Sequence, residues 1–128
     1  MGIERPDVDQ FILDEIDSVP HLEALLLLWR SAPRQCSARQ LADQLYITQA
    51  RATTIAEDLH RRGLIAREAR HDGAYFYDTR LEERNQLMEA VHETHRRELI
   101  RISGIIHSKA SPGIRAFADA FRFRKEKH

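Results

Sequence analysis

The chain has 128 residues, enough for one compact domain and too few for two, because such domains commonly contain about 100–150 residues. Its 42% hydrophobic and 31% charged residues, with only five glycines and four prolines, predict a helix-rich soluble protein and exclude fibrous and low-complexity classes. Twenty basic and twenty acidic side chains cancel, which excludes a protein held to nucleic acid by overall charge alone.

Cys36 is the only cysteine, so neither an intrachain disulfide nor a cysteine-cluster metal site can form. We expect a buried structural thiol there in preference to a redox sensor. The amino terminus shows no signal-peptide pattern, and the apolar run Leu25–Leu28 is far shorter than the roughly 20 residues needed to cross a bilayer. These features predict a cytoplasmic protein without membrane attachment.

Two helices are expected in the first quarter of the chain. The first, Asp7–Asp17, carries apolar residues along one side. The second, His21–Ser31, follows a helix-start signal at Pro20 and is apolar almost all round, so it should lie centrally. Ala32–Arg34 breaks this helix, and Gln35–Cys36 is predicted to form a short strand beside a later hairpin.

A helix-turn-helix is predicted between Ser37 and Arg62. Ser37 and Gln40 match the S-x-x-Q capping pattern of a helix start, and this first helix runs to Leu45. After a break at Tyr46–Thr48, where the threonine offers a second cap, a new helical phase begins. Its apolar positions have the spacing i, i+3, i+4, i+7 and are Ala52, Ile55, Ala56 and Leu59. The opposite face of the second helix is polar.

A β-hairpin is predicted directly after the second helix. Gly63 ends the helix as a left-handed cap would. Leu64–Glu68 and Ala74–Asp78 have strand-like patterns, and the polar residues Arg70–Gly73 form the turn between them. Alternation along the second strand should place Tyr75 and Tyr77 on one face and Phe76 on the other.

The order helix, turn, helix and hairpin resembles the winged-helix domain of the MarR and ArsR type of bacterial transcriptional regulators. The most specific part is the register of Leu41–Ala42, Ile47, Leu59 and Gly63–Ile65, which fall where such domains carry core, turn and helix-ending residues. Tyr46 departs from the pattern, since many of these domains have a glycine there. The resemblance implies a mainly α fold with a small β-hairpin wing, and a homodimer that binds double-stranded DNA sequence-specifically.

The C-terminal part is predicted to contain two helices. Leu81 to Ile106 has no proline and only one glycine, Gly104, so it reads as one long helix of about 37 Å at 1.5 Å per residue. A final aromatic helix is expected after a loop over 108–113, with Ser111 as its cap and proline in its first turn. Six apolar residues exceed what a small head should bury and predict a dimer interface: Leu99, Ile102, Ile105, Ile106, Phe117 and Phe121.

The second helix of the motif is the candidate DNA reader, because Arg can bond guanine, Gln can bond adenine and Thr can meet a thymine methyl group in the major groove. The candidate contacts are Gln49, Arg51, Thr53 and Thr54 in this helix, Arg67, Arg70 and His71 in the wing, and Arg39 in the first motif helix. The alternative is an ordinary solvated face, since Glu57 and Asp58 would repel phosphates if they pointed the same way.

Metal and catalytic sites are not expected. His92 and His95 have the i, i+3 spacing of two residues on one helical face, but no carboxylate or cysteine of recognised ligand spacing accompanies them. We therefore predict no metal and no cofactor. The sequence contains no G-x-S-x-G, Gly-rich phosphate loop or H-E-x-x-H pattern, so we expect a protein that is not an enzyme.

The leading hypothesis assigns residues 1–80 to an N-terminal helix and a DNA-binding head, and residues 81–128 to dimerisation, within one compact domain overall. The function is then that of a sequence-specific DNA-binding transcriptional regulator acting as a homodimer, with no effector specified. The alternative is a winged-helix module that binds protein without DNA, favoured by the zero net charge and by acidic residues in the second motif helix.

Overall fold

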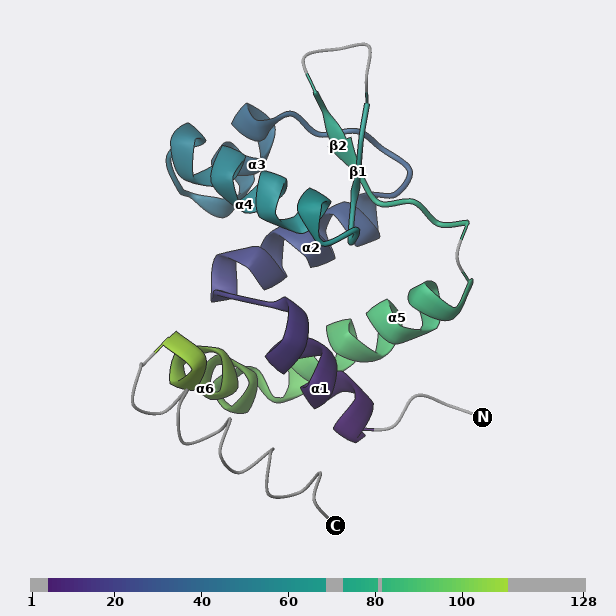
Figure 1. Cartoon of the computed structure of the whole chain (residues 1–128), viewed down its shortest axis with the longest axis vertical. Helices are drawn as coiled ribbons and strands as arrows, with labels where there is room; N and C mark the ends of the chain where they lie inside the picture. Colours follow the sequence, from purple (N-terminus) through teal and green to yellow (C-terminus); the bar gives the residue numbers. More distant parts are fainter. Residues whose placement is uncertain (1–4, 69–72, 81, 111–128) are drawn as a thin grey trace.

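The computed structural model describes residues 5–68, 73–80 and 82–110. The predicted mainly α fold with a small β-hairpin wing is confirmed (Figure 1). Along the described chain the elements are α1 (Arg5–Glu15), α2 (Val19–Ser31), α3 (Ala38–Leu45), α4 (Gln49–Arg61), β1 (Ala66–Arg67), β2 (Tyr75–Phe76), α5 (Glu82–Arg97) and α6 (Leu99–Ala110). None of the helices within these residues is long and apolar enough to cross a membrane.

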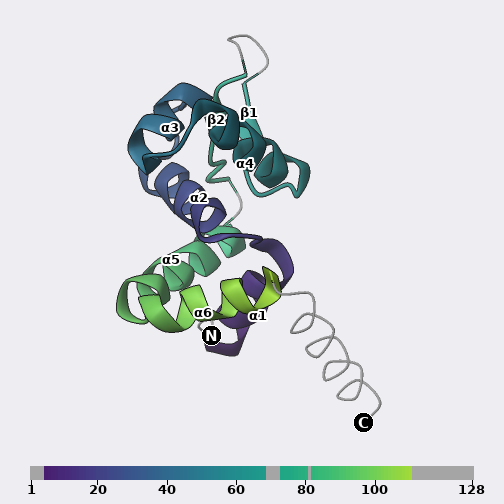
Figure 2. The ribbon, with the colours of Figure 1, turned by 90° about the vertical axis from the view of Figure 1, so that its left-hand side faces the viewer.

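The helices form two groups joined by α2. The helix-turn-helix α3–α4 and the wing lie at one end of the molecule, and α1, α5 and α6 lie at the other (Figures 1 and 2). As expected for a helix that is apolar almost all round, α2 contacts members of both groups: α3, α4 and β2 on one side, and α5 and α6 on the other. The N-terminal helix α1 packs against α5 and α6.

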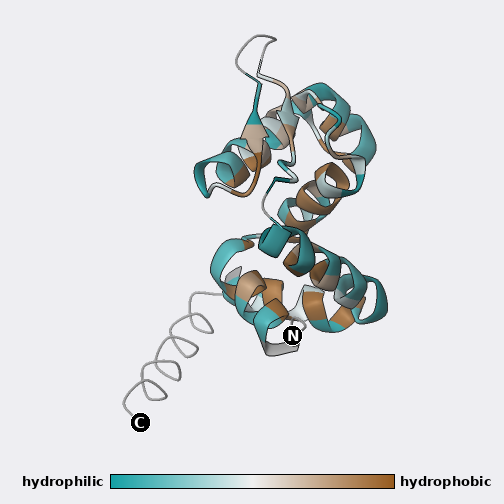
Figure 3. Cartoon of the chain, turned by 90° about the vertical axis from the view of Figure 1, so that its right-hand side faces the viewer, coloured by the Kyte–Doolittle hydropathy of each residue, from teal (hydrophilic) through white to brown (hydrophobic). Residues whose placement is uncertain are grey.

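One continuous apolar core runs through both groups, and Figure 3 shows the apolar faces of the helices turned toward each other. Leu22, Leu25 and Leu28 of α2 are fully buried at its centre. Deep burial of this kind stabilises a fold by about 1.5–3 kcal/mol for each large aliphatic side chain. The core therefore fixes the head and the C-terminal helices relative to α2.

The wing is a two-stranded antiparallel hairpin in which Ala66 pairs with Phe76 and Arg67 with Tyr75. The short extra strand expected at Gln35–Cys36 is reduced to an isolated β-bridge, in which the backbone N–H and C=O of Cys36 each bond Tyr75 at 2.7 Å. The predicted alternation is confirmed, since Tyr75 and Tyr77 are buried while Phe76 is half-buried. Burial also raises the pKa of the half-buried Cys36 thiol, as expected of a structural cysteine.

The prediction of one long helix from Leu81 to Ile106 is wrong, because the chain turns at Glu98 and forms α5 and α6. Arg101 donates from Nε to Glu98 Oε1 and from Nη1 to Asp9 Oδ2, both at 2.8 Å, and so ties the start of α6 to α1. The turn brings the apolar side of α6 back onto the core, so both halves bury their apolar faces.

The remaining boundaries differ slightly from expectation. Both α1 and α2 begin two residues earlier than predicted, and α1 also ends two residues earlier, at Glu15. Strands β1 and β2 are shorter than the patterns that predicted them. The expected final aromatic helix, with Ser111, Phe117 and Phe121, lies outside the described residues.

Candidate nucleic-acid interface

Local capping fixes where α4 begins. The predicted capping box of α3 is present, with Ser37 Oγ accepting from Gln40 N at 3.1 Å and Gln40 Oε1 accepting from Ser37 N at 2.8 Å. The chain then turns through Tyr46, and Thr48 Oγ1 accepts from Arg51 N at 3.1 Å to start α4. The motif is therefore built as the sequence predicts, with α4 following α3 after one tight turn.

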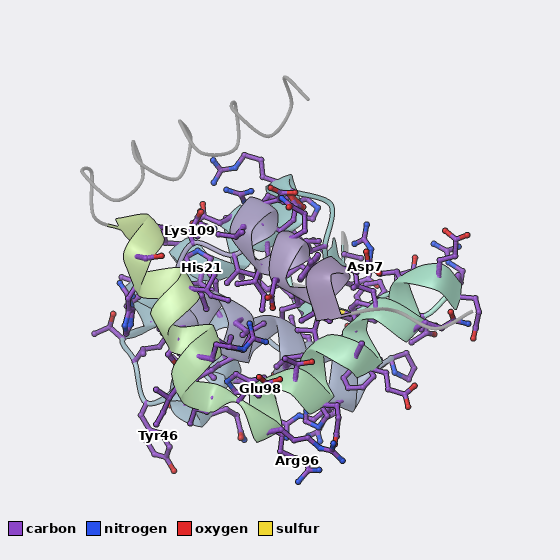
Figure 4. The ribbon with its side chains drawn as sticks, turned by 90° about the horizontal axis from the view of Figure 1, so that it is seen from below. Asp7, His21, Tyr46, Arg96, Glu98 and Lys109 are labelled. Carbon is purple, nitrogen blue, oxygen red and sulfur yellow. The ribbon has the colours of Figure 1, made fainter. Side chains whose placement is uncertain are left out.

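Tyr46 takes an unusual conformation at this turn. Its φ of 58° is in the left-handed region, which a bulky side chain enters at a cost, and its side chain is 94% exposed. Figure 4 shows the ring pointing away from the body of the molecule. Burial of the ring therefore contributes nothing that would offset the cost of the backbone conformation.

One face of α4 is buried and the other is exposed. The predicted core positions Ala52, Ile55, Ala56 and Leu59 are buried, and α4 packs against α2. All four candidate readers on α4 are exposed, namely Gln49, Arg51, Thr53 and Thr54. Since these lie in the first turns of α4, the exposed start of the helix is the natural part to face a ligand.

The hydroxyls of the two threonines bond the helix itself. Thr53 Oγ1 donates to Gln49 O at 3.0 Å, and Thr54 Oγ1 donates to Ala50 O at 3.2 Å. Bonds of this kind occupy the donor and leave the threonine methyl groups as the natural groups for contact with a thymine methyl. Within the described residues, neither the exposed Arg39 of α3 nor Arg51 of α4 forms an ion pair.

Glu57, which the sequence suggested would repel phosphates, is bound by the wing. Its Oε1 lies 3.3 Å from Arg67 Nη1, and its Oε2 accepts the Tyr75 hydroxyl at 3.0 Å. Burial raises the pKa of Tyr75, and the hydrogen bond to Glu57 adds to the rise. The carboxylate is thus shared between two wing residues, and Arg67, a predicted DNA contact, already has a partner.

Gly73 makes room for this arrangement. Its φ of 73° lies in the left-handed region, and a Cβ at this position would overlap the guanidinium of Arg67. The other two candidate wing contacts, Arg70 and His71, lie outside the described residues.

Asp58, the second acidic residue of α4, is bound by α2 and by its own helix. Its Oδ2 lies 2.9 Å from His21 Nε2, and its Oδ1 accepts from Arg61. His21 is 8% exposed, and Ser18 Oγ lies 2.5 Å from its Nδ1. Both carboxylates of α4 are therefore compensated by neighbouring residues, which no pattern in the sequence indicated.

Four of the six residues predicted for a dimer interface are described, and they have different environments. Ile102 and Ile106 are 0% and 1% exposed, so both are buried within their own chain. They therefore add no exposed apolar surface to an interface. Ile105 is partly buried, and Leu99 is half-exposed. Sequence reasoning missed Ile100, which is 88% exposed beside Leu99 and could have been found by its position off the α6 core stripe.

Three potential metal ligands lie together where α2 meets α4, away from the exposed face of α4. Ligand atoms of Asp17, His21 and Asp58 are within 4.8 Å of one another. Arg62 binds the Asp17 carboxylate at 3.1 Å, and Asp58 is bound as described above, so cations of the protein already compensate both carboxylates. The group therefore behaves as an ion-pair network.

The two histidines of α5 have structural contacts. The ring of His92 lies 5.5 Å from that of Trp29 in a tilted arrangement. Burial lowers the pKa of His95, whose Nε2 is buried and has no hydrogen-bond partner among the described residues. His95 also lines a hollow of about 240 Å³ between α2, the end of α3 and α5.

A larger hollow of about 810 Å³ lies between the first turns of α1 and α5. Its apolar part comes from Phe11 and Leu87. Its acidic residues Asp7, Glu82 and Glu83 belong to first helical turns, where carboxylates complement the helix dipole. The acidic charges beside the hollow are thus explained by the helices themselves.

Comparison with protein families places the helix-turn-helix and wing in a known group. Residues 18–74 match the MarR family. Residues 18–74 thus form a winged-helix segment similar to that of the MarR family. The matched segment extends from the cap of α2 to the residue before β2, so it contains the described candidate DNA contacts on α3, α4 and β1. No curated protein sequence matches the chain.

Solved structures support the same MarR-type fold over most of the chain. A MarR family protein from Bacillus stearothermophilus is 19% identical with a TM-score of 0.52, over 96% of this chain and 83% of that one. MepR, a transcription regulator of the Staphylococcus aureus multidrug efflux pump MepA, is 16% identical with a TM-score of 0.53, over 95% and 87%. A MarR family transcriptional regulator from Silicibacter pomeroyi is 18% identical, with a TM-score of 0.53, over 93% and 82%. Together with the family match, these structures support a winged-helix fold of the MarR type.

Proposed function

We propose that this MarR-type protein is a cytoplasmic transcriptional regulator that binds double-stranded DNA sequence-specifically through α4 and the wing. Gln49, Arg51, Thr53 and Thr54 then meet base edges in the major groove. Arg39, Arg67, Arg70 and His71 are the proposed contacts to the DNA backbone. The exposed α4 residues and Arg39 belong to the helix-turn-helix motif. This motif lies within the segment that matches the MarR family, and that match does not depend on which residues contact DNA.

The observation that carries the proposal is the disposition of charge on α4. Glu57 and Asp58 are bound by Arg67, Tyr75, His21 and Arg61, whereas Arg51 is exposed without an ion pair among the described residues. A local excess of positive charge at the start of α4 is compatible with zero net charge, because binding depends on the field at the contacting face.

Selection of bound sequences from a random duplex pool, repeated at two salt concentrations, tests this proposal. We expect an enriched palindrome whose affinity falls as salt rises, because bound lysines and arginines release counterions from DNA. No enrichment, combined with retained binding to a protein from a cell extract, would instead support the protein-interaction module that zero net charge favours.

We further propose that the protein acts as a homodimer in which residues 81–128 supply the main interface. Leu99 and Ile100 support this, since the two exposed apolar side chains lie next to each other at the start of α6. Two-fold symmetry would place two copies of α4 about 34 Å apart, one turn of DNA. Light scattering should give twice the monomer mass at micromolar concentration, and a monomer there would remove the dimer proposal.

A further inference from the structure

The end of α1 is held by side chains from two other helices. An α-helix leaves its last carbonyl groups without partners inside the helix, and α1 has no basic residue of its own in the last turn. Lys109 of α6 supplies one partner: its Nζ donates to Ile12 O at 3.0 Å and also to Ile16 O. A cation at the negative end of a helix dipole is the stabilising arrangement.

Arg62, which directly follows α4, supplies the second partner. As the C-cap residue of that helix, it donates from Nη1 to Asp14 O at 3.0 Å and from Nη2 to both Asp17 oxygens at 3.1 and 3.2 Å. It also lies 3.6 Å from the Glu15 carboxylate. Residues 12–17 are therefore hydrogen-bonded to α6 through Lys109 and to the end of α4 through Arg62.

We propose that residues 12–17 are a positioning element through which α6 sets the orientation of the DNA-reading helix α4. This inference rests on the proposed function, since it concerns how the reading helix is held. Lys109 and Arg62 are its positioning residues, and neither is among the proposed contacts to base edges. Figure 1 shows α6 and the wing at opposite ends of the molecule, and residues 12–17 contact both Lys109 of α6 and Arg62 at the end of α4.

The physical reason is that both cations use backbone oxygens of one short segment. Losing the Lys109 bonds removes the side-chain donor from Ile16 O, just after α1, and leaves Ile12 O with the Ile16 amide at 3.1 Å, so the segment moves to recover a hydrogen bond with water. Any such movement displaces Asp14 O and Asp17, to which Arg62 is bound. A second contact lies nearby: Asp58 of α4 pairs with His21 of α2, and both side chains lie close to Asp17. The C-terminal end of α4 therefore moves with residues 12–17.

Hydrogen exchange tests the coupling without DNA. The reporters are the amides of Arg62, Gly63 and Leu64, which bond Asp58 O, His60 O and Leu59 O at the end of α4. In Lys109→Met we expect these amides to exchange about threefold to tenfold faster, because the substitution frees the segment that Arg62 holds. Lys109→Arg should restore slow exchange, since it keeps a donor at the same carbonyls.

Arg96→Met is the matched control. It also removes one positive charge, but Arg96 pairs with Glu93 inside α5 and does not touch α1. Its reporter amides should exchange as in the wild type. Unchanged exchange in Lys109→Met, or equal acceleration in Arg96→Met, would overturn the proposal.

A double-mutant cycle gives the second readout. If the Lys109 and Arg62 contacts act through the same segment, the double variant Lys109→Met/Arg62→Met should accelerate exchange by less than the product of the two separate effects. A simple product would show two independent contacts and would overturn the coupling.

The DNA arm of the experiment separates this inference from the proposed function. With a duplex that the wild type binds, Lys109→Met should weaken affinity by about threefold to tenfold, while Arg96→Met leaves it unchanged. If the wild type binds no duplex, the proposed function fails, and the exchange measurements still decide whether α6 positions the end of α4.

Discussion

Arg51 is the side chain on which the proposed interface depends most directly. It is exposed in the first turn of α4, where side chains of a recognition helix reach base edges. Arg51→Ala should therefore cost about 1–3 kcal/mol in binding to the selected duplex and relax the preference at one base position. Anisotropy titrations on the selected and a scrambled duplex measure both effects.

Arg61→Ala is the control for this experiment. It removes the same charge at the other end of α4, from a residue that is bound to Asp58. We expect it to weaken both duplexes alike, if at all. Equal losses on both duplexes for Arg51→Ala would exclude a role in reading bases.

Tyr46 leads to a prediction about stability. A left-handed conformation costs a residue with a side chain roughly 1–2 kcal/mol relative to glycine, and the exposed Tyr46 ring makes no buried contacts that would offset this cost. Because glycine also loses more backbone entropy on folding, Tyr46→Gly should raise the free energy of unfolding by about 0.5–1 kcal/mol. Thermal or urea unfolding measures it. Tyr46→Phe keeps the strain and should leave stability unchanged, and a drop in stability for the glycine variant would disprove the strain argument.

At the scale of single residues, the sequence predicted caps and burial but could not predict partners. Ser37 and Thr48 were identified because a cap and its target are three residues apart in sequence. The partners of Glu57 and Asp58 lie on the wing and on α2, at separations that depend on the folded path of the chain. Only the structure therefore showed that these acids face their own protein.

At the scale of elements, the break between α5 and α6 shows why periodicity alone failed. Val91 and Ile102 are both buried, and their separation of eleven residues is about three helical turns. The apolar stripe therefore keeps the same phase whether or not the helix breaks between them. No proline or glycine marks Glu98, and the contact of Arg101 with Asp9 connects parts of the chain that only folding brings together.

The hairpin of β1 and β2 depends on Gly73, and this can be tested. An alanine there would need a left-handed backbone and would displace the Arg67 guanidinium from its place beside Glu57. Gly73→Ala should therefore lower the free energy of unfolding by about 1–2 kcal/mol, with the largest increase in hydrogen exchange in the wing.

Gly104→Ala provides the comparison for Gly73→Ala. Gly104 lies inside α6, is exposed, and has open space where a Cβ would be added. Alanine is favoured over glycine inside a helix by about 0.5–1 kcal/mol, so this variant should be more stable than the wild type. A loss of the same size at both positions would argue against a specific role for Gly73.

At the scale of the whole molecule, the buried core should make stability fall in alkali. Tyr77 is 1% exposed, its hydroxyl has no partner among the described residues, and burial raises its pKa to about 12. Between pH 10 and 12 the unfolded chain loses the phenol proton while the folded protein keeps it. The stability present below pH 10 is therefore lost as the pH rises toward 12, by up to about 2–3 kcal/mol.

Tyr77→Phe is the test of this pH dependence. Urea unfolding at several pH values should give a shallower decline above pH 10 for this variant than for the wild type. Because the hydroxyl is unpartnered, the variant should be about as stable as the wild type at neutral pH. Parallel curves for the two proteins would show that other groups cause the alkaline loss.

The pairing of Glu57 with the wing has a consequence for anyone redesigning the proposed DNA-binding face of this protein. Replacing an acidic residue near a DNA-binding face with lysine is a common way to strengthen attraction to phosphate. Here Glu57→Lys would set two like charges against each other, because Arg67 lies 3.3 Å from the carboxylate that it replaces, and Tyr75 would lose its acceptor. The gain in long-range attraction would be screened by salt, while the damage to the wing would not. Charge could be added with less structural damage at positions such as Asp43, which is exposed on α3 and forms no ion pair among the described residues.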